Sequence, residues 1–186
     1  MDRRTLPTEF TIDGVVCPFD ADFRNVLDIF QIMNDPDLLD QEKFELALEY
    51  FYTTNDYQIN IAQAAIEMAT FLNGGTYDNT PQKQVKPLFD WEQDFDIIIP
   101  PINKIIGHDI RGDKFVHWWT FLSAFMEIGE CTFSTFVSIR DKINRNIKLD
   151  KTEEKIYRDN IDKIKLKTHY DSTTQSLMDE IMGLEG

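Results

Sequence analysis

Residues 117–128 read His117-Trp118-Trp119-Thr120-Phe121-Leu122-Ser123-Ala124-Phe125-Met126-Glu127-Ile128, and the architecture of the chain depends on this segment more than on any other. Adjacent residues of a helix point about 100° apart, so Trp118 and Trp119 cannot share one narrow stripe. Apolar residues recur three or four positions apart and predict a helix with a broad apolar arc. The arc consists of Phe115, Trp118, Trp119, Phe121, Leu122, Phe125, Met126 and Ile128. Such a helix must pack against more than one element, or against another chain.

The aromatic side chains of this segment support two interpretations. Trp118, Trp119, Phe121 and Phe125 at helical spacing are typical of a core. The same residues would bind a partner if they lined an exposed groove for a helix, because large aromatic residues dominate protein interfaces. We therefore treat them both as core candidates and as candidate partner-binding residues.

Length and composition predict one globular domain. The chain has 186 residues, of which 42% are apolar and 12% aromatic, which suffices for one core. We expect a single compact helical domain over residues 1–167, with residues 74–88 as the candidate subdomain boundary, and a flexible acidic tail over residues 168–186. No apolar run is long enough to span a membrane, and residues 1–8 lack the features of a signal peptide, so we expect a soluble intracellular protein.

Turn and cap residues give the order of the elements before the tryptophan segment. An Asp13-Gly14 turn between short β-prone runs predicts a hairpin over residues 9–18. Asp20 or Asp22 should cap a first helix, which Asn34-Asp35-Pro36 ends. Two further helices are expected, from about residue 40 and from about residue 59 to the stop at Asn73-Gly74-Gly75.

Later segments complete a mainly α fold of six or seven helices with a small N-terminal β-hairpin. Helical patterning restarts at residue 90, and Pro100-Pro101 should kink or break that helix. Residues 131–140 alternate as a strand would, yet they favour a helix capped by Thr132. Residues 151–161 form a charged helix in which Lys, Glu, Arg and Asp are spaced for ion pairs.

Charge is distributed unevenly. The net charge is −14, of which residues 1–100 contribute −13, whereas residues 140–167 carry +4. A strongly acidic body repels phosphates, so we expect no nucleic-acid binding. A partner with a basic or amphipathic surface is compatible with this charge, although the charge could also serve solubility alone. The basic segment is either a solvated face or a partner surface, and for the latter we single out Arg140, Lys142, Arg145 and Lys148.

The sequence offers no catalytic or metal-binding signature. Asp90, Glu92, Asp94 and Asp96 cluster in a first helical turn, where we expect them to be solvated, and no nucleophile or oxyanion donor accompanies them. The three histidines and two cysteines lack the spacing of a zinc site, and the cysteines are expected to be free thiols. We expect no enzymatic activity, no metal and no cofactor.

Three segments are distinctive in their residues and spacing: 95–111 (FDIIIPPINKIIGHDIR), 115–121 (FVHWWTF) and 127–130 (EIGE). Together they resemble the bacteriophage gene-product-fifteen family of siphophages and prophages of Gram-positive bacteria. The resemblance extends over roughly residues 15–165. The positions that match the family motif are Pro100, Pro101, Asn103, Gly107, Arg111, His117, Trp118, Trp119 and Phe121.

The resemblance implies a function through gene position, because genes of this family typically precede the tape-measure gene of the tail module. It implies a tail assembly chaperone that binds and solubilises the tape-measure protein in the host cytoplasm. The tail-tube protein and further copies of the chain are additional candidate partners. The alternatives are a structural tail or connector protein retained in the virion and an acidic decoy for a host DNA-binding protein.

Overall fold

The structure is a computed structural model and describes residues 4–53, 59–76 and 86–167. Within these ranges it contains eight α-helices, one 3-10 turn (η1) and one two-stranded sheet. The predicted mainly α architecture with an N-terminal hairpin is therefore confirmed, and the helix beyond the predicted six or seven is a four-residue one. The expected tail over residues 168–186 and most of the candidate boundary at 74–88 lie outside the described residues.

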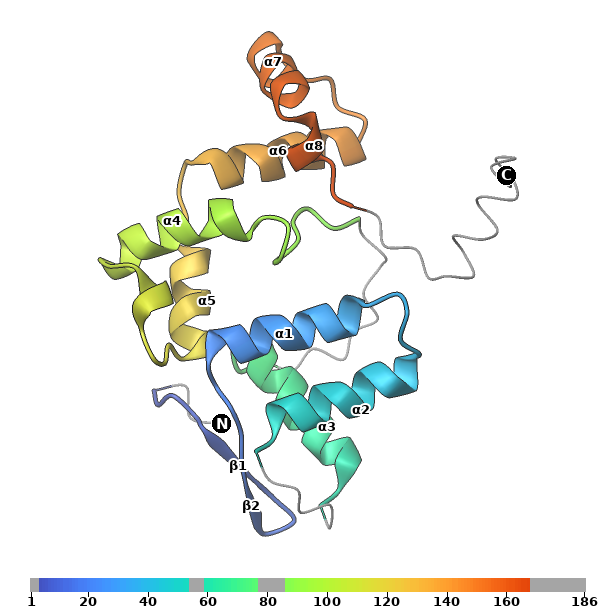
Figure 1. Ribbon diagram of the computed structural model, residues 1–186, viewed down its shortest axis with the longest axis vertical. Coiled ribbons are helices and arrows are strands. Elements are labelled where there is room, and N and C mark those ends of the chain that lie inside the picture. Colours follow the sequence, from blue (N-terminus) through green and yellow to red (C-terminus); the bar gives the residue numbers. More distant parts are fainter. Residues whose placement is uncertain (1–3, 54–58, 77–85, 168–186) are drawn as a thin grey trace.

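The hairpin forms at the predicted turn and lies at one end of the long axis (Figure 1). Strand β1 (Glu9–Ile12) pairs antiparallel with β2 (Val15–Pro18). Asp13 and Gly14 between them have φ values of 51° and 82°. Positive φ at both central residues is the geometry that an Asp-Gly hairpin turn requires.

Three helices pack beside the hairpin. They are α1 (Phe23–Asn34), α2 (Asp40–Phe51) and α3 (Ile61–Leu72). Asp22 caps α1, because its carboxylate accepts a hydrogen bond from the backbone N–H of Arg24 at 2.9 Å. Helix α1 contacts α2 and α5, α2 contacts α3, and α3 contacts β1. This arrangement packs β1 against α3 and α1 against the tryptophan segment.

The middle layer consists of α4 (Phe95–Ile106), η1 (Ile110–Gly112) and α5 (Trp118–Met126). Helix α4 contains both Pro100 and Pro101, so the break considered for this position is absent. The helix continues because Ile98, Ile99 and Ile102 around the prolines are at most 2% exposed. Their burial offsets the backbone hydrogen bonds that the two prolines cannot donate.

Three helices form the opposite end of the molecule: α6 (Thr132–Asn144), α7 (Lys151–Asp159) and α8 (Ile161–Ile164) (Figure 1). The helical interpretation of residues 131–140 is confirmed, but the N-cap is Cys131 rather than Thr132. Most buried apolar residues form one cluster, and Phe136, Ile139 and Ile164 form a second, smaller one. Ile97 of α4 packs against both clusters.

Gly107 ends α4 in a left-handed conformation with φ of 97°. A methyl group built at this position meets no atom within 4 Å, so the conformation alone makes alanine unfavourable. We expect Gly107→Ala to lower the free energy of unfolding by about 1 kcal/mol. Urea denaturation measures this. Gly112→Ala is the control, because Gly112 also has free space but no positive φ; equal effects of both substitutions would contradict the explanation.

Candidate functional site

The two adjacent tryptophans join α5 to the end of α3. The indole N–H of Trp118 donates to the carbonyl of Leu72 at 3.0 Å, and that of Trp119 donates to the carbonyl of Phe71 at 2.9 Å. These carbonyls belong to the last turn of α3, which has no intrahelical partners for them. Trp118 and Trp119 are 1% and 8% exposed. Their role as core residues is thereby established, and Phe121, also fully buried, shares it.

His117 connects the start of α5 to the N-terminal segment. Its Nδ1 accepts a hydrogen bond from the backbone N–H of Trp119 at 3.0 Å, and its Nε2 lies 2.9 Å from the carbonyl of Pro7. This pattern fits the neutral tautomer with the proton on Nε2. Burial lowers the pKa of His117. A second proton, on Nδ1, would also place the ring N–H opposite the backbone N–H of Trp119, so that two donors face each other.

Stability should therefore depend on the protonation of His117. Below about pH 6.5, the ordinary imidazole pKa, the unfolded chain takes up a proton here that the folded chain does not. The contribution of His117 is thus present above that pH and is lost as the pH falls toward its lower folded pKa. We expect the stability advantage of wild type over His117→Asn to shrink from about pH 7.5 to 5.5. Urea denaturation across this range measures it; an advantage that stays constant would contradict the neutral assignment.

Two open hollows flank the C-terminal half of α5. One has a volume of about 770 Å³ and lies between α5, α3, α1 and the segment before α4. The other has a volume of about 490 Å³ and lies between α5, α6 and residue Leu88. Both are lined by Phe125 and Met126. We call the combined surface the Met126 groove; its main apolar lining residues are Leu72, Leu88, Phe89, Trp91, Leu122, Phe125, Met126, Ile128, Phe133 and Val137.

Met126 is the most exposed apolar residue of the groove. Its exposed fraction is 75%, because it ends α5 on the side facing away from the core. Phe125 is only half-buried and contacts the rings of Phe89, Trp91 and Phe133. Of the candidate aromatic residues, Trp118 and Trp119 line only the larger hollow and are at most 8% exposed, whereas Phe125 lines both hollows and is half-buried. The grouping of these aromatic rings gives the groove an apolar floor.

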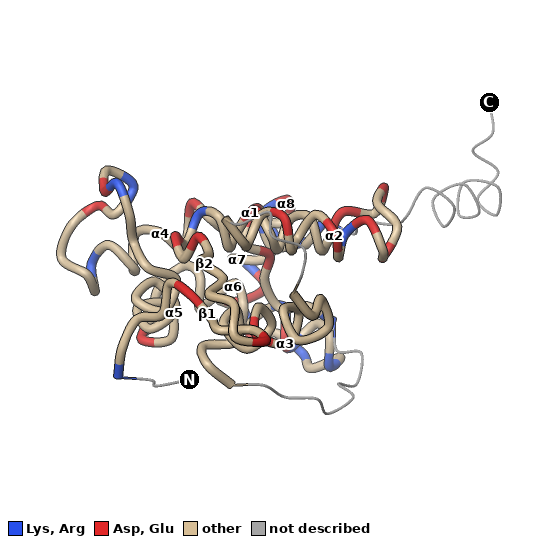
Figure 2. The backbone as a smooth tube through the Cα atoms, turned by 90° about the horizontal axis from the view of Figure 1, so that it is seen from below, with Lys and Arg blue, Asp and Glu red and all other residues tan. Residues whose placement is uncertain are grey.

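The charged residues that line the groove are both acidic. They are Glu127, next to Met126, and Asp141 on α6. Asp141 pairs with Arg145 at 3.2 Å, whereas Glu127 and the nearby exposed Glu130 have no ion pair among the described residues. Acidic side chains occur on many other elements of the molecule as well (Figure 2).

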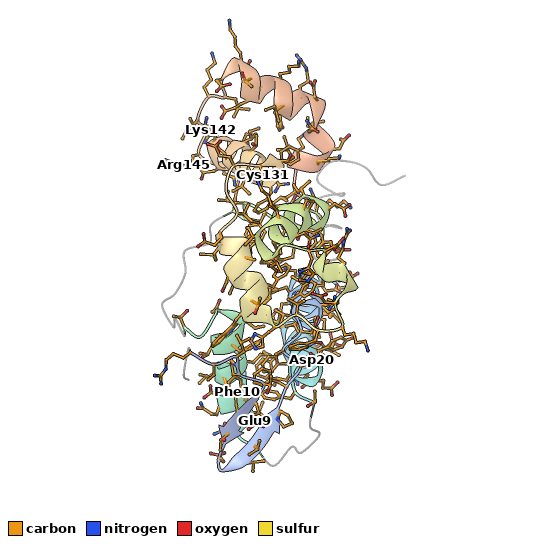
Figure 3. The ribbon with its side chains drawn as sticks, turned by 90° about the vertical axis from the view of Figure 1, so that its left-hand side faces the viewer. Glu9, Phe10, Asp20, Cys131, Lys142 and Arg145 are labelled. Carbon is orange, nitrogen blue, oxygen red and sulfur yellow. The ribbon has the colours of Figure 1, made fainter. Side chains whose placement is uncertain are left out.

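The four basic candidates do not form one surface. Arg140 is 5% exposed, which corrects its assignment as a residue that a partner could contact. Lys142 forms an ion pair with Glu153, and its hydrogen bond holds the pKa of Glu153 below the usual range. Lys142 lies on α6 and Arg145 is its C-cap, both far from the hairpin (Figure 3). Lys148 is exposed beyond α6, so Arg145 and Lys148 remain the accessible members of the set.

Arg140 instead forms a buried ion pair with Asp94. The distances are 2.6 Å from Nη1 to Oδ2 and 2.9 Å from Nη2 to Oδ1. The remaining donors reach the carbonyls of Leu88, Lys163 and Ile164, so all five N–H groups of the side chain have acceptors. Asp94 is 1% exposed, which corrects the expectation that this carboxylate is solvated.

The other family-motif residues shape the turn after α4. Asn103 accepts a hydrogen bond from the backbone N–H of Ile110 at 3.1 Å. Arg111 pairs with Asp109 at 2.6 Å, and its hydrogen bonds hold the pKa of Asp109 well below the usual range. With Pro100 and Pro101 inside α4 and Gly107 at its end, these residues hold the backbone that leads into α5.

The apolar arc of residues 115–128 predicts a helix that packs against more than one element, and its aromatic residues were candidates for both a core and a docking groove. The sequence does not show which side chains line the groove, and Met126 of this arc is the one that is 75% exposed. Leu88, Phe89 and Trp91 lie in an irregular segment, where helical periodicity gives no information about which side chains are exposed. The one available signal was that this arc is too broad for a helix buried on a single side.

The residues that the structure describes show neither a metal-binding cluster nor a membrane-spanning helix. Among residues 4–53, 59–76 and 86–167, no group of three or more His, Cys, Asp and Glu side chains is placed to hold a metal ion. Cys17 and Cys131 are not joined in a disulfide, as expected. Over the same part of the chain, no helix combines the length and apolarity that crossing a bilayer demands.

Comparison with known proteins gives one match. The family model described as Bacteriophage Gp15 protein matches residues 3–171. No curated protein and no solved structure matches the chain. The match covers all described helices and both strands.

Proposed function

The chain belongs to the bacteriophage Gp15 protein family, and from that membership we propose that it is a tail assembly chaperone for the tape-measure protein. The family match over residues 3–171 carries the proposal, because genes of this family typically precede the tape-measure gene. The proposed role is one of binding rather than catalysis, and its proposed location is the host cytoplasm.

The Met126 groove supports a binding role. A tape-measure protein is a long chain with amphipathic helices, which would aggregate if left uncovered. An open apolar surface between helices is a common binding site for such a helix. The net charge of −14 would keep a complex of many copies in solution until tail-tube subunits replace them.

Co-expression with the tape-measure protein encoded downstream tests the function. We expect the soluble fraction of the tape-measure protein to rise with the chaperone, and a tagged copy to co-purify with it. Light scattering on the purified complex should then give several copies per tape measure. An unchanged soluble fraction, together with the protein in purified virions by mass spectrometry, would instead indicate a structural tail or connector protein.

A further inference from the structure

The Met126 groove has the chemistry of a site for one particular kind of helix. Its floor is apolar, and its most exposed apolar residue is Met126, which is 75% exposed. A methionine side chain is flexible and polarizable, so it adapts to apolar partners of different shape. The groove therefore requires an apolar stripe in its occupant but does not demand one sequence.

The walls of the groove favour a helical occupant. Its lining residues come from α1, α3, α5, α6 and the segment before α4. No strand edge is among the elements that line it in the described part of the chain, so an extended peptide would find no ladder of backbone partners. A helix satisfies its own backbone and needs only side-chain contacts.

The charges at the rim favour a basic occupant. Glu127 lines the groove and is exposed without an ion pair among the described residues, and Asp141 is the other acidic lining residue. Residues 168–186 of the same chain carry four acidic residues and no Lys or Arg. That segment, or a second copy of this acidic chain, would bring charge of the same sign to the rim.

We propose that the Met126 groove binds an amphipathic helix whose apolar stripe is flanked by lysine or arginine side chains. This inference deepens the chaperone function and rests on it for the identity of the natural partner. Apolar residues three and four positions apart on the partner contact Phe125 and Met126. Basic side chains beside that stripe reach Glu127.

A fluorescent model peptide tests the site without the tape-measure protein. The probe is an amphipathic peptide of about 18 residues, five helical turns, with leucines on one face and lysines on the other. A matched peptide carries glutamate in place of lysine. Fluorescence anisotropy with the full-length protein gives the dissociation constants.

Met126→Asp is the decisive variant, and Leu39→Asp is its control. Leu39 is 71% exposed but lies outside the groove, so both substitutions replace an exposed apolar side chain by the same carboxylate. We expect Met126→Asp to weaken the lysine peptide at least ten-fold and Leu39→Asp to change it less than two-fold. Attraction by charge alone would predict tighter binding to Met126→Asp, because that variant is more acidic.

Glu127→Lys tests the acidic rim of the groove, and Glu49→Lys is its control. Glu49 is exposed on α2, outside the groove. We expect weaker binding of the lysine peptide only for Glu127→Lys, and the glutamate peptide should bind wild type at least ten-fold more weakly. Thermal unfolding of each variant verifies that it is folded.

Several results would overturn the proposal. One is binding that Met126→Asp leaves unchanged, and another is a glutamate peptide that binds as tightly as the lysine peptide. Displacement of the probe by an equal concentration of a peptide of residues 168–186 would assign the groove to the chain's own tail. Self-association that Met126→Asp abolishes would assign it to a second copy. Because the probe is synthetic, these outcomes are independent of whether co-expression supports the chaperone function.

Discussion

Replacing Arg140 with methionine is expected to lower the free energy of unfolding by about 3–5 kcal/mol, because it leaves a buried carboxylate without its partner. Asp94 is 1% exposed and receives two of the five hydrogen bonds that Arg140 donates. The carbonyls of Leu88, Lys163 and Ile164 lose their donors in the same substitution. Urea denaturation measures the change, which corresponds to a fall in Tm of roughly 10 °C for a chain of this size.

Arg145→Met is the matched control for this prediction. It makes the same replacement at the C-cap of α6, where the ion pair with Asp141 is exposed. Exposed pairs of this kind contribute less than about 1 kcal/mol. If Arg140→Met and Arg145→Met lowered stability equally, the buried pair would not have the structural role described here.

The substitution Trp118→Ala should have an effect of comparable size. The side chain is 1% exposed and contacts the rings of Phe30, Trp91 and Phe121. Its removal leaves a cavity and deprives the carbonyl of Leu72 of its donor. We expect a loss of about 3–5 kcal/mol in the free energy of unfolding, measured by urea denaturation.

Phe115→Ala is the control for Trp118→Ala, because Phe115 precedes the same helix but is 53% exposed. We expect its effect to stay within about 1 kcal/mol. Trp118→Phe separates the two contributions, since it keeps most of the apolar volume but loses the indole donor. A Trp118→Phe variant as unstable as Trp118→Ala would mean that the hydrogen bond, rather than packing, dominates.

Local chemistry was sufficient to predict most of the elements. The Asp13-Gly14 turn, the cap at Asp22 and the helix stop before Gly74 each depend on residues within one or two turns. These signals operate on the backbone directly, through positive φ and unpaired N–H groups. They therefore survive the packing of the chain, and the structure reproduces them.

The groove and the buried ion pair depend on contacts that no local pattern encodes. Asp94 and Arg140 are 46 residues apart in the sequence, and each is at a position typical of a solvated helix surface. Their burial results from how α6 and α8 pack on the segment before α4. Similarly, Met126 is exposed because α5 ends there, which periodicity within the helix does not reveal.

Much of the recognisable family pattern is structural in this protein. His117, Trp118 and Trp119 connect α5 to the N-terminal segment and to α3, while Asn103 and Gly107 shape the turn that precedes it. The partner-binding candidates of the groove, Met126 above all, lie beside this framework rather than within it. Mutations in the motif should therefore act mainly through stability, and mutations in the groove through binding.

The contact between the N-terminal segment and residues 116–118 has a consequence for how the chain folds on the ribosome. Asp22 accepts a hydrogen bond from the backbone N–H of Val116, Ala21 from that of Trp118, and Pro7 faces His117. These partners are up to 110 residues apart, so the first segment cannot complete its native contacts until the tryptophans have left the exit tunnel. Translation therefore produces most of the chain before its first residues reach their final environment.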